Sequence, residues 1–245
     1  MSNAIKMFIG TSSNGEDNEI EAAYEYSLRK NTKHELDIVW MQQTADEDSY
    51  WHGWNSKNWS TPFSGFRWGI PQYCNYKGRA IYTDCDMINL RDIADLWNLE
   101  MPEDKWMLAR NGKRFGGKEF CVILFDCEKF LYNIAHPNEW KHVDFAHQHY
   151  MKFFIDSGHV GDLDARWNCH DGDNLTLNEI WHLHYTDMAT QPWRPEWYVG
   201  PKEEHLRKDL VNLFWHTLVK AKNAGYTPRK RLTKENKFAY NFLGK

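Results

Sequence analysis

The sequence predicts an α/β protein with a mixed, mostly parallel central sheet, flanking helices and a helix near the C-terminus. Two observations carry this prediction. The first forty residues alternate between strand, helix and strand patterns, which is how a parallel sheet usually begins. Near the other end, residues 203–224 repeat apolar side chains at helical spacing.

The opening elements are short and clearly delimited. Residues 5–9 are an apolar run that enters the loop Gly10-Thr11-Ser12-Ser13-Asn14-Gly15, so we expect a buried strand there. Residues 18–30 place Ile20, Ala23, Tyr24 and Leu28 on one face of a helix. Residues 36–41 are a second apolar run and predict a second strand.

The rest of the chain continues the alternation less regularly. Residues 44–59 are polar and rich in tryptophan, which predicts an irregular loop, and residues 62–76 predict a helix broken at Pro71. Further strands are expected at 79–83, 106–109, 120–125 and 180–185, and further helices at 92–99, 145–155 and 203–224. The apolar stripe of the last helix consists of Leu206, Leu210, Leu213, Phe214 and Leu218.

Length and composition limit the possible functions. A chain of 245 residues suits one domain, which we place at residues 1–200, with a helix and basic tail at 201–245 packing on it. The net charge of −4 argues against a nucleic-acid partner, and we find no transmembrane segment. Five cysteines without a CxxC pair are typical of reduced thiols, so we expect a cytoplasmic protein. Aromatic residues make up 16%, enough for a sugar-stacking surface, although most should be buried.

A carboxylate pair follows the strand predicted at residues 79–83. Asp84 and Asp86 flank Cys85 directly after this strand, and ligands of open α/β sheets lie beyond the carboxyl ends of strands. Two carboxylates there favour Mg²⁺ or Mn²⁺, and such a cation can bridge a diphosphate. The tripeptide alone fits a solvated loop equally well, so its context decides the interpretation.

Three segments resemble the motifs of one enzyme family. Residues 81–97 resemble the YLDxDxxxxxDIxxLW block of family 8 glycosyltransferases, and residues 184–193 resemble their HxxGxxKPW signature. Residues 163–168 resemble the LPxxYN segment. The resemblance spans most of residues 5–195. It implies a GT-A type fold whose nucleotide-sugar-binding domain occupies residues 1–200.

The resemblance also implies roles for particular residues. It makes Asp84, Asp86 and His184 the ligands of Mn²⁺ (or Mg²⁺), with both aspartates acting in catalysis. The residues expected to contact the nucleotide-sugar donor are Gly10, Thr11, Ser12, Arg67, Asp84, Cys85, Gln191 and Arg194. Gln148 is expected beside the anomeric carbon. The family transfers hexoses from UDP-sugars with retention of configuration, here to a glycan or another hydroxyl acceptor that the sequence does not identify.

The sequence departs from the family pattern in three places. Gln191 stands where the family has a diphosphate-binding lysine, and Arg194 is the cation expected to replace it. The NxGVxLxN strand appears as residues 119–126 without its Asn and Gly. The family's DQ pair is matched by His147-Gln148, or by Asp144 nearby.

Three other functions remain open at this stage. A zinc enzyme could use the pairs His147 and His149, Cys169 and His170, or His182 and His184, although no HExxH or CxxC framework accompanies them. A non-catalytic, Trp-rich carbohydrate-binding domain could occupy a degenerate transferase scaffold. A nucleotidyltransferase would need a Gly-rich phosphate loop and a lysine after the first strand, and both are missing. The tryptophan-rich loop 51–59 is the candidate wall of an acceptor pocket.

Overall fold

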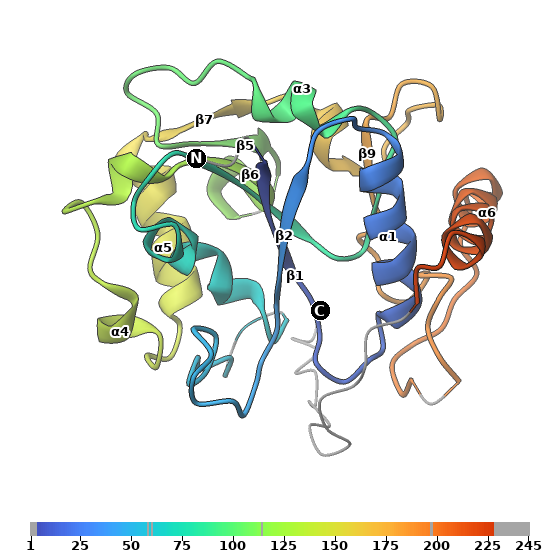
Figure 1. Ribbon diagram of the computed structural model, residues 1–245, viewed down its shortest axis with the longest axis horizontal. Helices are drawn as coiled ribbons and strands as arrows, with labels where there is room; N and C mark the ends of the chain where they lie inside the picture. Colours follow the sequence, from blue (N-terminus) through green and yellow to red (C-terminus); the bar gives the residue numbers. More distant parts are fainter. Residues whose placement is uncertain (1–3, 58, 60, 114, 197, 228–245) are drawn as a thin grey trace.

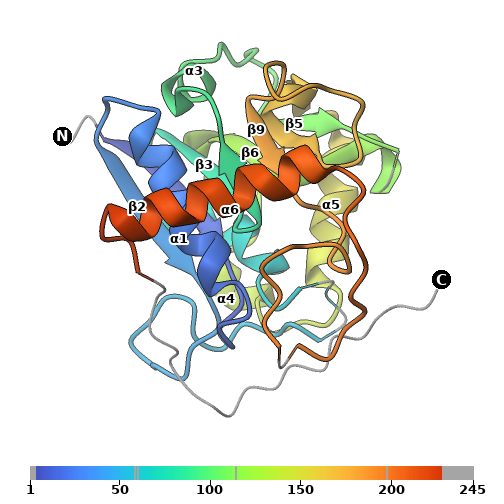
Figure 2. The same ribbon diagram turned by 90° about the vertical axis from the view of Figure 1, so that its right-hand side faces the viewer.

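The computed structural model describes residues 4–57, 59, 61–113, 115–196 and 198–227. A six-stranded sheet in the order β2-β1-β3-β6-β5-β7 forms its centre. Helices α1 and α6 lie on one side of this sheet and α4 and α5 on the other (Figure 1). Figure 2 shows α6 crossing over α1, and these two helices contact each other. The predicted α/β architecture with flanking helices is confirmed.

The central sheet is mixed. Strand β1 (Ile5–Gly10) pairs in parallel with β2 (Leu36–Met41) and with β3 (Arg79–Asp84). Strand β6 (Lys118–Asp126) is antiparallel to β3 and to β5 (Met107–Asn111), while β7 (Val160–Leu163) runs parallel to β5. Three of these pairings are therefore parallel and two antiparallel.

A second, three-stranded sheet adjoins the first. Strand β4 (Met87–Asn89) is antiparallel to β9 (His182–His184), with Met87 opposite His184. Strand β8 (Cys169–His170) is parallel to β9, with His170 opposite His184. Because β3 ends at Asp84 and β4 begins at Met87, the chain between them passes from one sheet to the other. The predicted carboxylate pair lies at this junction.

The helices differ in length and type. The α-helices are α1 (Asn18–Lys30), α2 (Ile70–Tyr73), α3 (Ile93–Trp97), α4 (Pro137–Trp140), α5 (Ala146–Ser157) and α6 (Lys208–Asn223). The 3-10 segments are η1 (Ser64–Gly69), η2 (Phe115–Gly117), η3 (Cys127–Phe130) and η4 (Ala165–Asn168). No helix in the described part of the chain is long and apolar enough to cross a membrane.

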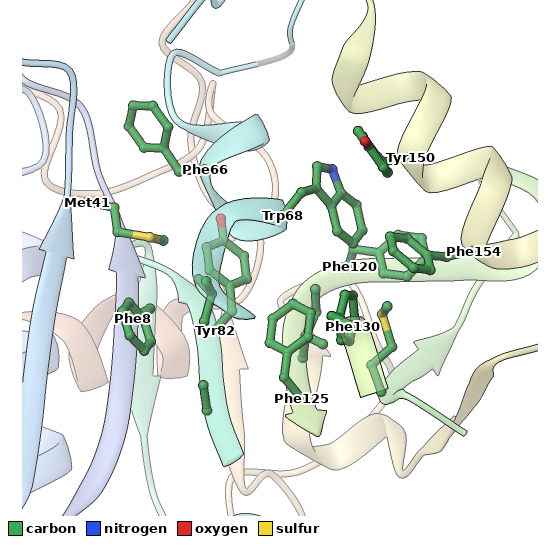
Figure 3. Packing of buried hydrophobic residues seen from close by; sticks show 14 of the residues in the cluster. Phe8, Met41, Phe66, Trp68, Tyr82, Phe120, Phe125, Phe130, Tyr150 and Phe154 are labelled. Atoms are coloured by element: carbon green, nitrogen blue, oxygen red, sulfur yellow. The ribbon is translucent and has the colours of Figure 1, made fainter. Parts of the chain in front are cut away.

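An aromatic core fills the space between the sheet and α5. Trp68 from η1 packs against Phe154 of α5, with ring centroids 5.1 Å apart, and Figure 3 shows Phe120, Phe125 and Phe130 beside them. The loop 51–59 adds its three indoles to this core. These rings are buried and pack against Phe66, so they do not form an exposed stacking surface. The place of this loop in a wall of the acceptor pocket remains a prediction.

Two helix predictions were wrong in their limits. Residues 62–76 form η1 and the short α2, so the segment is interrupted between Gly69 and Ile70 rather than at Pro71. Pro71 lies in the first turn of α2, where a missing N–H is harmless. The last helix begins at Lys208 instead of Glu203, so Leu206 precedes it and is 94% exposed. Strands β4, β7 and β8 were not predicted, since each spans four residues or fewer.

Candidate metal and donor site

Asp84 is held at the end of β3 by two buried neighbours. Arg67 Nη2 donates to Asp84 Oδ1 at 3.2 Å, and the Tyr82 hydroxyl donates to the same oxygen. The guanidinium lies 4.4 Å from the centre of the Tyr82 ring, and its Nε donates to the Ser64 carbonyl at 2.7 Å. Arg67 is thus a buried counter-charge that fixes Asp84, whose other oxygen can face a ligand.

His184 is oriented from behind by an amide. Its Nδ1 lies 3.0 Å from Asn168 Oδ1, which can only accept, so this contact places the proton on Nδ1. Its Nε2 then faces Asp86 Oδ1 at 3.2 Å. Burial alone would lower the pKa of His184, but the negative charge of Asp86 raises it above its ordinary value. An imidazole fixed in this way presents Nε2 to a cation beside Asp86.

The potential ligand atoms gather around His184. Those of Asp84, Cys121 and His184 all lie within 4.8 Å of one another. Asp86 reaches the same imidazole, and no other described donor bonds to its Oδ1. Carboxylates beside an anchored imidazole fit a divalent cation, because Mn²⁺ accepts both oxygen and nitrogen ligands and Mg²⁺ binds carboxylate oxygens.

Cys121 was not predicted as part of the site. Burial is the main reason that the pKa of its thiol is raised well above the ordinary value, and the charge of Asp84 raises it further. The zinc-enzyme alternative relied on other pairs of histidine and cysteine residues. In the described part of the chain, only Asp84, Cys121 and His184 form a metal-capable group of three or more, so His147, His149 and Cys169 belong to no such group. Asp86 lies outside this group as well and meets it through the His184 imidazole.

The loop after β1 begins directly beside Asp84. Gly10 stands opposite Asp84 in the β1–β3 pair. A Cβ on Gly10 would lie 2.6 Å from Phe63 Cδ2 and 3.0 Å from the Tyr82 hydroxyl, so a side chain does not fit there. Thr11 and Ser12 are buried, as is Cys85. The structure therefore brings the predicted donor-binding loop and the carboxylate pair together.

Gln191 and Arg194 are both held by acidic side chains. Gln191 Nε2 donates to Asp86 Oδ2 at 3.0 Å and to the Tyr185 carbonyl at 2.7 Å. Arg194 Nη1 lies 3.0 Å from Asp17 Oδ1 and 3.7 Å from Glu16 Oε2. Gln191 therefore contacts one of the predicted metal-binding carboxylates, whereas Arg194 binds two acidic residues of the loop after β1. The predicted contacts of both residues with the donor remain predictions.

A second charged network adjoins the predicted metal ligands and was missed by sequence analysis. Glu119 Oε2 lies 2.8 Å from His170 Nε2 and 3.5 Å from Arg110 Nε. The His170 and His184 rings are 5.7 Å apart. Burial would raise the pKa of Glu119, but His170 and Arg110 lower it below the ordinary value, so this carboxylate stays ionised. In the sequence, the only sign of this network was Glu119 itself, which stands where the family has an asparagine.

The N-terminus of α5 contributes His147 and Gln148. Trp68 Nε1 donates to His147 Nδ1 at 3.0 Å, and burial together with the charge of Arg67 holds the pKa of His147 well below its ordinary value. Gln148 follows it and is half-buried. Asp144, the other candidate for the DQ position, is exposed and pairs with Lys57 at 3.4 Å.

Comparisons with solved structures identify the fold. No protein-family model matches the sequence, and a search of curated proteins finds no match. The glycosyltransferase GlyE of Streptococcus pneumoniae TIGR4 is similar over 92% of this chain and 66% of its own, with 16% identity and a TM-score of 0.60. The galactosyltransferase LgtC matches over 88% and 96%, and the bifunctional glycosyltransferase WbbM over 91% and 52%, each with 12% identity and a TM-score of 0.59.

These similarities show that the chain has the GT-A type fold of these glycosyltransferases, as the sequence predicted. The chain spans slightly less than two thirds of GlyE and about half of WbbM, so both of those chains extend well beyond the part that it matches.

Proposed function

We propose that this chain is a metal-dependent glycosyltransferase that moves a hexose from a UDP-sugar to a hydroxyl acceptor, with retention of configuration. One observation carries the proposal. In a GT-A type fold, the imidazole of His184 is fixed by Asn168 and faces Asp86, with Asp84 beside it. Carboxylates beside an imidazole are suitable ligands for a cation that also binds a nucleotide diphosphate.

The protein groups have separate tasks in this mechanism. Asp84, Asp86 and His184 would hold Mn²⁺ or Mg²⁺, which when bound neutralises the charge of the departing nucleoside diphosphate. Arg67 and Tyr82 keep Asp84 in place, and Asn168 keeps the imidazole turned toward the site. These supports are buried, so the ligands are positioned before the donor arrives.

The donor would lie along the edge where β1 and β3 end. The nucleotide base would pack against Gly10, Thr11 and Ser12, because Gly10 stands opposite Asp84. Cys85 would also contact the donor. Gln148 would stand beside the anomeric carbon. An active-site Gln-to-Glu mutant is described for LgtC, which matches this chain with a TM-score of 0.60, and this supports a glutamine in the active site. The acceptor is a glycan or another hydroxyl compound.

The non-catalytic carbohydrate-binding alternative is less well supported. It relied on exposed tryptophans, but the indoles of Trp51, Trp54 and Trp59 are at most 7% exposed and pack in the core. A built cation site also has no task in a domain that only stacks sugar rings. The transferase interpretation therefore accounts for more of the structure.

Nucleotide binding tests the proposal. We expect UDP to raise the melting temperature only when Mn²⁺ or Mg²⁺ is present, because the diphosphate binds through the cation. Asp86→Asn should remove this shift. Asp95→Asn is the matched control, since Asp95 forms an exposed ion pair with Arg91 at 2.6 Å. An equal shift by UDP in excess chelator, or an undiminished shift in Asp86→Asn, would refute the proposed cation site.

A further inference from the structure

We propose that Cys121 is an additional ligand of the cation, so that the centre prefers thiophilic divalent ions such as Co²⁺, Zn²⁺ and Cd²⁺ over Mg²⁺. The inference rests on the proposed function in one respect, because both place the cation on Asp84 and His184. It concerns a residue that the family resemblance does not include, because the resembling strand has glycine at this position.

Cys121 lies in a bulge of β6. Ala109 of β5 stands opposite Ile123, but the next residue, Arg110, stands opposite Glu119. Residues 120–122 therefore have no counterpart on β5. A bulge of this kind bends the strand and turns a side chain away from its regular direction. Cys121 is the middle residue of the stretch that lacks a counterpart on β5.

The neighbouring strand brings Asp84 to the same place. Thr83 of β3 stands opposite Val122 of β6 in antiparallel pairing, so Asp84 and Cys121 are the next residues along the two strands. Their ligand atoms and that of His184 lie within 4.8 Å of one another. One cation can therefore touch a carboxylate oxygen, a sulfur and an imidazole nitrogen together.

The sulfur determines which ions bind well. Mg²⁺ takes oxygen ligands and holds its water firmly, whereas Zn²⁺ and Co²⁺ accept thiolate, imidazole and carboxylate in one centre. When such an ion binds, the Cys121 thiol releases its proton to solvent and a metal–thiolate bond forms. The structural alternative is a protonated thiol that only contacts Asp84 and never binds metal.

Absorption spectroscopy of the cobalt-loaded protein separates these two roles. We expect Co²⁺ to give a sulfur-to-cobalt charge-transfer band in the wild-type protein. Cys121→Ser should lose this band while still binding Co²⁺. Cys74→Ser is the matched control and should keep it, because Cys74 lies at the end of α2 beside Cys127. Cys121→Ser should also reduce the preference for Zn²⁺ over Mg²⁺ by at least about tenfold in competition titrations.

Three results would overturn the inference, and they differ in what else they affect. Cobalt binding without a charge-transfer band in the wild-type protein would exclude Cys121 as a ligand and leave the proposed function intact. Absence of any cobalt binding would remove the cation centre itself, and with it both proposals. A band that persists in Cys121→Ser and in Cys121→Ala would assign the sulfur to another residue.

Discussion

His184 and His182 lie two residues apart on β9 and have different surroundings. The His184 ring is held between Asn168 and Asp86, whereas neither ring nitrogen of His182 bonds to a described group. The His182 ring instead packs 5.4 Å from the Tyr24 ring, and burial lowers its pKa to about 3. One histidine therefore has the environment of a ligand, and the other that of a neutral core residue.

This difference predicts opposite effects on metal binding. His184→Ala should weaken Mn²⁺ affinity by at least about tenfold, because an anchored ligand is lost. His182→Leu should leave Mn²⁺ affinity unchanged, since it replaces a neutral buried ring by an apolar side chain. Calorimetric titration with Mn²⁺ measures both values. Equal losses in the two variants would show that His184 is a packing residue.

Glu16 is a buried carboxyl group whose pKa is raised to about 7, first by burial and then by the charge of Asp17. Because the folded-state pKa lies above the ordinary value of 4.5, the folded protein binds this proton more tightly than the unfolded chain. Its contribution to stability is therefore complete below pH 4.5 and is lost as the pH rises through 7.

Glu16→Gln tests this assignment, because glutamine does not titrate. We expect the free energy of unfolding of the variant, relative to the wild type, to rise between pH 5 and pH 8 by on the order of 1–3 kcal/mol. Urea denaturation at the two pH values measures it. A difference that does not change with pH would mean that Glu16 titrates at the same pH in the folded and unfolded protein.

At the scale of elements, the start of α6 depends on a contact made outside the helix. His205 Nε2 lies 3.2 Å from Asp171 Oδ2, and the Arg207 backbone N–H donates to His205 Nδ1 at 3.0 Å. These contacts hold residues 205–207 in a turn, so the helix begins only at Lys208. Leu206 therefore leaves the apolar stripe that sequence periodicity assigned to it, whereas Leu210 remains buried.

Alanine variants of these two leucines should behave differently. Leu210→Ala should lower the free energy of unfolding by about 2–5 kcal/mol, because a fully buried side chain leaves a cavity. Leu206→Ala should change it by less than about 0.5 kcal/mol, since the side chain is almost fully exposed. Chemical denaturation measures both. A substantial loss in Leu206→Ala would mean that the helix begins earlier and buries this residue.

At the scale of elements, the spacing of apolar residues predicts some features of the fold and not others. Residues 18–30 and 36–41 were predicted with the bounds of α1 and β2, because apolar spacing and the following polar residues mark both ends. The bulge in β6 was not predictable, since it depends on pairing with β5. Cys121 and Glu119 were missed for this reason: their positions follow from strand register rather than from a local motif.

For the molecule as a whole, the segment after β9 is joined to the loop after β1. Trp193 Nε1 donates to Asp17 Oδ1 at 3.1 Å, and Arg194 binds the same oxygen at 3.0 Å. The sequence motifs assigned both segments to the donor-binding site. They gave no sign that the two segments contact each other. The acceptor pocket was beyond prediction for a related reason, because the loop proposed for it folds its indoles inward.

Arg194 is the residue that joins these segments most strongly. Arg194→Ala should lower the free energy of unfolding by about 3–5 kcal/mol, because Asp17 and Glu16 would lose their buried cation. We also expect weaker UDP binding, since a charge-assisted contact to a diphosphate contributes about 1.5–3 kcal/mol. Denaturation and calorimetry test the two effects separately. Unchanged UDP affinity in a folded variant would remove Arg194 from the donor site.

The most direct test of the whole account is the release of UDP from a UDP-hexose. The wild-type protein with Mn²⁺ should release UDP, slowly by hydrolysis without acceptor and faster once a suitable acceptor is present. Asp84→Asn and the wild-type protein in excess chelator should both lose this activity by several orders of magnitude, because the leaving diphosphate would lack its counter-charge. Full UDP release in excess chelator would contradict a metal-dependent transferase centred on Asp84, Asp86 and His184.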